Sequence, residues 1–232
     1  MNYSQAILDI DKDLINNPAK RCACMVVLDT SFSMYGDEIK ELNRGIQTLV
    51  PTLQQNKTSA ASVELGVITA GGVVKEQLTM RSVMSLDYSP NFSASGNTPL
   101  GEAIELALAR LDARKAKYKQ SGTAYFQPWL IIISDGAPTD TEVWSRASQK
   151  VVQLAKQKKL VPLVVGVKGA DMKTLSRCSN RPALHLDGLR FQDMFQWISA
   201  SMIRVSASAA NGGFATLPPI TWADDQYSWD SL

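Results

Sequence analysis

Three segments of the chain are continuous apolar runs of strand length. They are CACMVVL at residues 22–28, WLIII at residues 129–133 and LVPLVVGV at residues 160–167. A strand that is apolar at every position must be covered on both faces, as strands are in a parallel sheet with helices on either side. The runs therefore predict a fold in which buried strands alternate with helices along the chain.

The segments between these runs have the spacing of amphipathic helices. One helix is predicted to begin at Asp37, because apolar residues recur at helical spacing from there and acidic residues stand in the first turn, where the helix dipole favours them. A second helix is predicted to begin at Thr98-Pro99, with the threonine as N-cap and the proline as the first helical residue. Further helices are predicted over residues 141–159 and 191–205.

Shorter strands complete the predicted sheet. Residues 62–70 and 73–78 lie on either side of Gly71-Gly72, which predicts an antiparallel hairpin, and residues 183–186 form a short strand. We expect an α/β fold with a doubly wound, mostly parallel six-stranded sheet and helices on both faces. The expected strand order is 3-2-1-4-5-6, with one antiparallel edge strand.

The length and charge of the chain limit its organisation and partners. A chain of 232 residues suits one domain of this kind with tails, and we expect an N-terminal extension over residues 1–19, the domain over 20–206 and a C-terminal tail over 207–232. The net charge of +2 does not indicate a nucleic-acid partner. No stretch reaches the roughly 18 to 20 apolar residues of a membrane helix, and the first residues do not resemble a signal peptide. We expect a cytoplasmic protein without membrane insertion.

The cysteines and the histidine are predicted to be structural. Cys22 and Cys24 share one face of a strand and Cys178 lies far away, a spacing that does not suit a zinc site, so all three are expected to be buried or half-buried thiols. His185 is the only histidine, and its place on a short strand indicates a packed residue rather than a catalytic base.

Oxygen-bearing side chains follow the buried strands. In the predicted strand order Asp29 ends the first strand and Asp135 ends its neighbour, so both carboxylates should meet at the carboxyl edge of the sheet together with Ser31, Ser33 and Thr98. Two carboxylates at this distance repel unless one keeps its proton or a dication lies between them. Ligands that are all oxygen suit Mg²⁺ or Mn²⁺, suit Ca²⁺ less well and do not suit zinc.

The same residues carry a resemblance to a known family. Residues 29–33, 96–100 and 134–136 resemble, in order, the three parts of the metal-ion-dependent adhesion site (MIDAS) of von Willebrand factor type A (VWA) domains. This resemblance covers roughly residues 20–205. The strings PWLIIISDGAPTDTEVW and VGVKGADMKTL are also similar to the bacterial TerY-like proteins of tellurite-resistance and stress-response gene clusters.

The resemblance implies a non-catalytic, metal-binding module for protein–protein interaction. By this resemblance Ser31, Ser33 and Thr98 contact the metal, while Asp29 and Asp135 act mainly through bound water and hydrogen bonds to the serines. One coordination position is left for an Asp or Glu of a protein partner. Phe32 departs from the family pattern, in which this position is commonly small, and its ring is expected to touch the partner beside the metal.

Enzymatic alternatives are less consistent with the sequence. A phosphatase with Asp29 as nucleophile is typically built on a DxDxT motif, but Ser31 stands at the third position. The chain also lacks the GxxxxGK[ST] and GxGxxG motifs after the first strand and the GxSxG motif of serine hydrolases. We therefore expect no enzymatic activity.

A non-enzymatic alternative stays open at this point. The chain could be a scaffold that binds elsewhere, with an incidental metal. Its binding surface would then be the basic stretch from Arg110 to Lys119, which is otherwise a solvated helix end, or the aromatic tail with Trp222, Tyr227 and Trp229. An aromatic tail of this kind is expected to dock on its own domain or on a partner.

Overall fold

The computed structural model describes residues 14, 16–135, 138–208 and 215–224. Within them the chain forms a six-stranded sheet with the order β3-β2-β1-β4-β5-β6, so the predicted fold class is confirmed. Neighbouring strands are parallel except β2 and β3, which form the predicted antiparallel hairpin. The strands are β1 (Cys22–Asp29), β2 (Val63–Gly71), β3 (Val73–Ser82), β4 (Trp129–Ser134), β5 (Val161–Gly166) and β6 (Leu184–His185).

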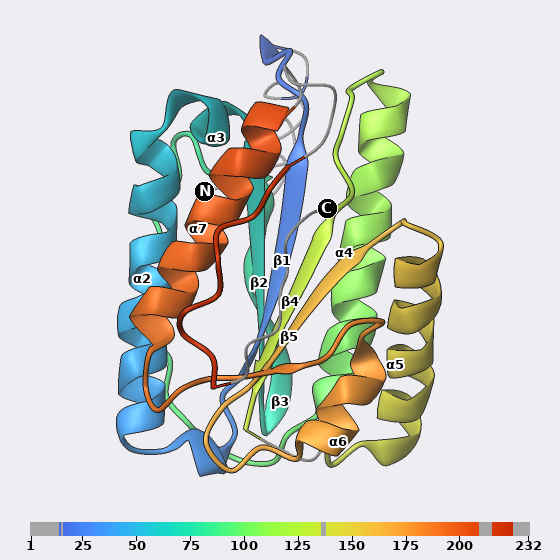
Figure 1. The fold of residues 1–232 in the computed structure, drawn as a ribbon. Helices are drawn as coiled ribbons and strands as arrows, with labels where there is room; N and C mark the ends of the chain where they lie inside the picture. Colours follow the sequence, from blue (N-terminus) through green and yellow to red (C-terminus); the bar gives the residue numbers. More distant parts are fainter. Residues whose placement is uncertain (1–13, 15, 136–137, 209–214, 225–232) are drawn as a thin grey trace, which may run out of the picture.

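Helices cover both faces of this sheet (Figure 1). The α-helices are α2 (Asp37–Gln55), α3 (Lys57–Ser62), α4 (Leu100–Gln120), α5 (Thr141–Lys156), α6 (Met172–Leu175) and α7 (Phe191–Ala207). Two 3-10 turns, η1 (Phe32–Met34) and η2 (Ser176–Cys178), lie between them. The short elements α3, α6, η1 and η2 were not predicted from the sequence, because segments of three to six residues are too short to show helical periodicity.

The apolar runs have the two-sided burial that was predicted for them. All eight residues of β1 are buried. Because successive side chains of a strand point to opposite faces, Val26 and Leu28 join the core beneath α2 and α7, while Met25 and Val27 join the core beneath α4 and α5. The three cysteines are fully buried free thiols, as predicted, and burial raises the pKa of Cys22 to about 12.

The start of α4 differs from the prediction. The helix begins at Leu100 with Pro99 at the N-cap position, so the prediction that Thr98 caps it is wrong. Its first amides are instead satisfied from the neighbouring segment, where the Asp140 carboxylate accepts hydrogen bonds from the amides of Gly101 at 3.1 Å and Glu102 at 2.7 Å. The Thr98 hydroxyl is therefore not needed to cap the helix.

The end of α5 also differs, because the helix stops three residues before Lys159. Two backbone hydrogen bonds close it, from Lys158 to the carbonyl of Ala155 at 3.0 Å and from Lys159 to the carbonyl of Leu154 at 2.9 Å. This is a Schellman closure, in which the residue after the C-cap adopts a positive φ. Here that residue is Lys158, with a φ of 56°.

The basic stretch of α4 is partly buried rather than wholly solvated. Arg114 is 5% exposed and donates to the carboxylate of Glu64 at 2.5 and 2.7 Å, and the Tyr118 hydroxyl donates to the same carboxylate at 2.6 Å. Arg110 pairs with Glu76 of β3 at 2.8 Å. Glu64 is the second residue of β2 and is fully buried, and a carboxylate buried there requires charged partners of this kind.

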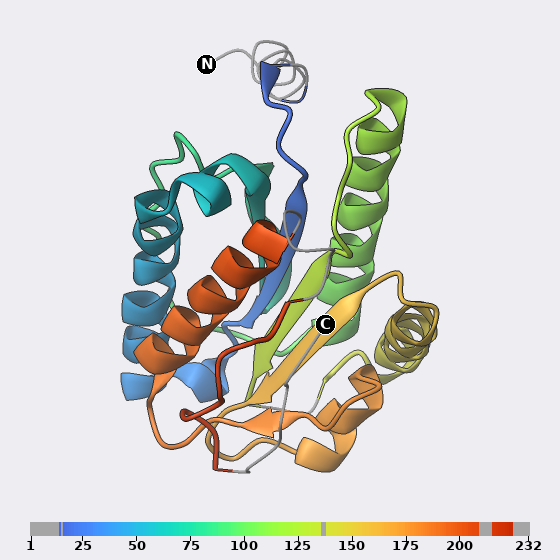
Figure 2. The same cartoon turned by 45° about the horizontal axis from the view of Figure 1, so that its top comes forward.

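Residues 215–224, which we call the C-terminal strap, run back along α7 toward β6 (Figures 1 and 2). Trp222 is fully buried and packs edge-on against Trp197, whose indole nitrogen donates to the carbonyl of Pro218 at 2.8 Å. The tail was predicted to dock on its own domain or on a partner, and Trp222 docks on its own domain. Tyr227 and Trp229 lie outside the described residues. In the part of the chain that is described, no helix is both long and apolar enough to cross a bilayer.

Candidate metal centre

The two carboxylates of the candidate site lie where β1 and β4 end. These strands are parallel neighbours, with Leu28 opposite Ile133, so Asp29 and Asp135 reach the same edge of the sheet. Asp29 is fully buried and Asp135 is 9% exposed. The negative charge of Asp135 acts on Asp29, so the structure places the two buried carboxylates within electrostatic range of each other.

Asp29 is held by its neighbours through both of its oxygens. Oδ1 accepts a hydrogen bond from the amide of Ser31 at 2.9 Å, and Oδ2 accepts one from the hydroxyl of Ser134 at 2.5 Å. Burial raises the pKa of Asp29 to about 6, although both hydrogen bonds act in the opposite direction. The charge of Asp135 adds to the rise. Sequence reasoning did not assign a role to Ser134, although it stands directly before Asp135.

The two serines are brought together by the turn η1. The amide of Met34 donates to the carbonyl of Ser31 at 3.1 Å, and the amide of Tyr35 donates to that of Phe32 at 3.0 Å. In this tight turn the hydroxyls of Ser31 and Ser33 lie 2.9 Å apart and share a hydrogen bond. Ser31 is buried and Ser33 is exposed, so the pair leads from the buried carboxylates to the surface.

Thr98 belongs to a loop that is bonded to the first one. The amide of Phe32 donates to the carbonyl of Gly96 at 2.9 Å, and the amide of Ser95 donates to that of Thr30 at 2.8 Å. Thr98 is 6% exposed, and its carbonyl accepts from the amide of Thr139 at 2.9 Å. Backbone hydrogen bonds thus join the first two segments, and the hydroxyl of Ser134 joins the third segment to Asp29.

The chemistry of the site fits a divalent cation. Asp135 Oδ1 is buried and has no hydrogen-bond partner among the described residues. An unpaired buried carboxylate oxygen is unfavourable unless a positive group satisfies it. The candidate side chains at this edge of the sheet offer carboxylate and hydroxyl oxygens, which are the ligands of Mg²⁺ and Mn²⁺.

Two exposed aromatic rings flank the site. Phe32 is 69% and Tyr35 is 70% exposed, and their rings stack with centroids 5.9 Å apart. The sequence analysis did not single out Tyr35. A predicted turn at residues 32–34 would have indicated that Tyr35 lies beside Phe32. Thr30 and Ser95 line a polar hollow of about 240 Å³, to which Lys75 also contributes.

His185 lies apart from this constellation. It is on β6, and its Nδ1 is 2.5 Å from a carboxylate oxygen of Asp224 in the C-terminal strap. Sequence reasoning predicted a packed strand residue but not this pairing, because the two residues are 39 positions apart.

Comparison with known proteins identifies the class of this domain. The family model of the von Willebrand factor type A domain matches residues 24–195, and the chain belongs to this family. A search of curated proteins finds no match.

Solved structures share the fold at low sequence identity. The pilus adhesin SpaC from Lactobacillus rhamnosus GG, in an open conformation, is 14% identical with a TM-score of 0.63, over 80% of this chain and 30% of the adhesin. The manganese-loaded TRAP protein of Plasmodium vivax is 16% identical with a TM-score of 0.56, over 75% of this chain and 72% of that protein. The ArnB paralog VWA2 from Sulfolobus acidocaldarius is 16% identical with a TM-score of 0.53, over 81% of this chain and 46% of that protein. The chain thus spans less than a third of SpaC, and these similarities concern the fold.

Proposed function

We propose that this domain is a metal-dependent protein–protein interaction module. Asp29, Ser31, Ser33, Thr98 and Asp135 would hold one divalent cation, and the cation would bind an Asp or Glu side chain of a protein partner. The observation that carries the proposal is the buried Asp135 Oδ1, which has no hydrogen-bond partner among the described residues and lies near a second buried carboxylate.

The proposed roles of the side chains agree with their hydrogen bonds. Both oxygens of Asp29 already accept protein hydrogen bonds, which suits a residue that orients the serines and acts on the metal through water. The hydroxyls of Ser31, Ser33 and Thr98 are neutral, so they would leave positive charge on the ion. A bound dication would supply a Lewis-acidic contact for a carboxylate, which is a favourable charge-assisted interaction where water is partly excluded.

We infer Mg²⁺ or Mn²⁺ as the ion, with Ca²⁺ less suitable, because a small set of oxygen ligands suits Mg²⁺, whereas Ca²⁺ takes six to eight oxygens. The manganese-loaded state of the similarly folded TRAP protein agrees with this choice. The exposed rings of Phe32 and Tyr35 would contact apolar surface beside the partner's acid. The TerY-like relation, the role in tellurite resistance or stress response and the cytoplasmic location are further parts of the proposal, and they rest on the sequence strings alone.

The alternative binding surfaces are weakened by their contacts. Arg110 and Arg114 of the basic stretch are already paired with Glu76 and Glu64. Trp222 of the aromatic tail is buried against its own domain. We propose no enzymatic activity.

Metal binding is tested by thermal unfolding. Mg²⁺ or Mn²⁺ should raise the melting temperature of the wild type, corresponding to about 2.7 kcal/mol at a metal concentration of roughly 100 times Kd. Asp135→Ala should abolish the rise without lowering the stability of the metal-free protein, since it removes a buried unpaired carboxylate. Asp37→Ala, at an exposed aspartate paired with Lys40, is the matched control and should respond like the wild type. An unchanged wild-type melting temperature at saturating metal would contradict the proposal.

Partner binding is tested by affinity capture from lysate with Mg²⁺ and with EDTA. The captured partner should be lost in EDTA, return with Mg²⁺ and fall away with Ser33→Ala, a substitution at an exposed side chain that leaves the core intact. Ser145→Ala, at an exposed serine of α5, should capture the partner normally. A partner that survives both EDTA and Ser33→Ala would show that the interface lies elsewhere.

A further inference from the structure

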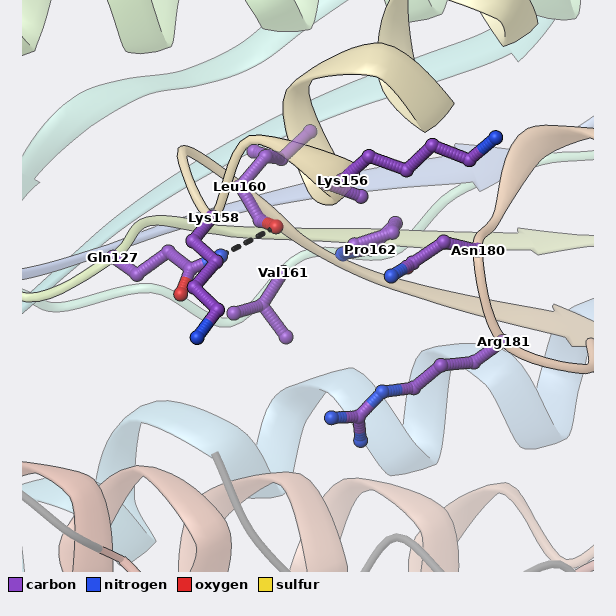
Figure 3. A pocket seen from close by; sticks show the side chains of 9 residues that line it. Gln127, Lys156, Lys158, Leu160, Val161, Pro162, Asn180 and Arg181 are labelled. Atoms are coloured by element: carbon purple, nitrogen blue, oxygen red, sulfur yellow. Dashed lines mark hydrogen bonds between the residues drawn. The ribbon is translucent and has the colours of Figure 1, made fainter.

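A second hollow of about 320 Å³ lies at the amino end of β5. Its floor includes Val161 and Pro162, which begin this strand (Figure 3). The strands β1, β4 and β5 are parallel, so this pocket and the candidate metal centre are at opposite edges of the sheet. Its volume is at the lower end of the range for small-molecule sites.

The charged side chains that line the pocket are all basic. Lys156 and Lys158 come from the end of α5, and Arg181 comes from the loop after η2; no Asp or Glu is among the described residues that line it. Figure 3 shows Lys158 and Arg181 on opposite sides of Val161, with Asn180 beside Pro162. Lys158 and Arg181 therefore line one pocket from two separate segments, whereas the side chain of Lys156 extends away from Val161.

Lys158 occupies a backbone position that favours glycine. It is the one non-glycine residue with a positive φ among the described residues. Lysines at a helix C-terminus are commonly explained by the helix dipole, and this explanation covers Lys156 and Lys159 as well. It does not explain why the strained position carries a long side chain, since glycine would close the helix at lower cost. Strain of this kind is often retained where the side chain has a function.

The surroundings of Arg181 favour an anion, and the exposed edge of β5 disfavours a peptide as the ligand. Partial burial lowers the pKa of Arg181 from its ordinary value, and the attraction between its guanidinium and an anion is stronger where less water surrounds them. β6 pairs with β5 only at Val165 and Gly166, so the amino half of β5 is not covered by a further strand. Pro162 has no amide hydrogen there, which disfavours the addition of a peptide strand to this edge.

We propose that this pocket binds a small molecule that carries a phosphate monoester. The phosphate would lie between Lys158 and Arg181, and the uncharged part of the molecule would lie on Val161 and Pro162. A phosphate monoester carries nearly two negative charges at pH 7, which matches the two cations Lys158 and Arg181 better than the single charge of a carboxylate does. A guanidinium can donate two parallel hydrogen bonds to one phosphate, and a lysine ammonium adds a point charge.

The first test measures ligand binding by calorimetry at constant ionic strength. Phenyl phosphate should bind 1:1 and more tightly than inorganic phosphate, because only the former can use the apolar floor. A phosphoserine peptide should bind no more tightly than inorganic phosphate. No saturable binding of phenyl phosphate, or tighter binding of the peptide, would overturn the proposal.

Variants locate the site. Arg181→Gln and Lys158→Gln should each weaken phenyl phosphate roughly tenfold or more, as expected for the loss of a charge-assisted contact. Lys159→Gln removes the same charge from the adjacent residue, which does not line the pocket, and should leave the affinity within about twofold of the wild type. If Lys159→Gln weakens binding as much as Lys158→Gln, the attraction comes from net charge alone and the proposal fails.

A further variant separates binding from folding. Lys158→Gly should raise the melting temperature of the ligand-free protein, because glycine relieves the positive φ, and should nevertheless lose phenyl phosphate binding. Asp135→Ala should bind phenyl phosphate like the wild type, so the test of this pocket does not depend on the outcome at the metal centre. Unchanged affinity in Lys158→Gly would contradict the proposed role of the lysine side chain.

Discussion

Gly72 and Gly96 approach each other closely beside the candidate metal centre. Both have a φ of 68°, and a Cβ built on Gly96 would be 2.4 Å from the Cα of Gly72. The carbonyl of Gly96 accepts the amide of Phe32, while the amide of Gly72 donates to the carbonyl of Asn97 at 2.7 Å. A side chain on Gly96 would therefore force the loop before Thr98 away from the β2–β3 hairpin.

Gly96→Ala should thus disturb both stability and metal binding. The added methyl group would combine left-handed strain of about 1–2 kcal/mol with a backbone clash that the loops can relieve only by separating. We expect a loss of more than about 2 kcal/mol in urea unfolding, and a weaker metal response in thermal unfolding.

Gly122→Ala is the matched control for this substitution. Gly122 has a φ of 67°, and nothing lies within 4 Å of its Cβ position. Gly122→Ala should therefore lower the free energy of unfolding only by the left-handed strain, about 1–2 kcal/mol, and should keep the metal response. Equal effects of the two substitutions would show that the contact with Gly72 is unimportant.

At the scale of elements, the position of Thr98 depends on how α4 begins. Asp140, directly before α5, accepts hydrogen bonds from the first amides of α4, so one carboxylate connects the starts of two helices. Gly101 allows this close approach, since a Cβ there would be 2.3 Å from the amide nitrogen of Trp144. The start of α4 is therefore set by its neighbour rather than by its own N-cap residue.

Asp140→Ala should destabilise the protein by about 1 kcal/mol, the usual effect of losing a helix cap. It should also weaken metal binding, because Thr98 directly precedes the uncapped end. Urea unfolding and metal titration would measure the two effects.

Asp171→Ala removes a comparable cap elsewhere. Asp171 accepts the amide of Thr174 at 3.1 Å at the start of α6. This control should lower stability without changing the metal affinity. If the two variants bind metal equally well, Asp140 has no role in positioning Thr98.

At the scale of the whole molecule, the C-terminal strap joins elements that are far apart in the sequence. Thr216 accepts a hydrogen bond from Arg204 of α7 at 3.0 Å, and the amide of Asp224 donates to the carbonyl of His185 on β6 at 3.0 Å. Trp222 fills the space between them and is fully buried. The strap thus packs on the same face of the sheet as α2 and α7.

Trp222→Ala should remove about 3–5 kcal/mol of stability, because it leaves a large cavity against Trp197. The exposed Phe32→Ala is the control and should change stability by no more than about 0.5 kcal/mol. Chemical denaturation of both variants would measure the difference. A loss below about 1 kcal/mol for Trp222→Ala would show that the strap is only loosely attached.

Much of the fold could be predicted because its signals are local. The strands β1, β4 and β5 appear in the sequence as uninterrupted apolar runs, and burial on both faces requires this composition. The strand order then implied that Asp29 and Asp135 end at one edge. The helix boundaries were less accurate, because the cap of α4 comes from Asp140, 40 residues after Leu100 in the printed sequence.

The sequence by itself thus determined the order of elements, the sheet and the candidate ligands, since apolar periodicity and short motifs act over neighbouring residues. Only the tertiary structure decided that Arg114 is buried against Glu64, 50 positions away, and that Trp222 packs on Trp197. Likewise, only the fold brings Lys158 and Arg181 to one pocket. Such contacts depend on how distant segments pack, and the sequence around either residue does not indicate which residue it will contact.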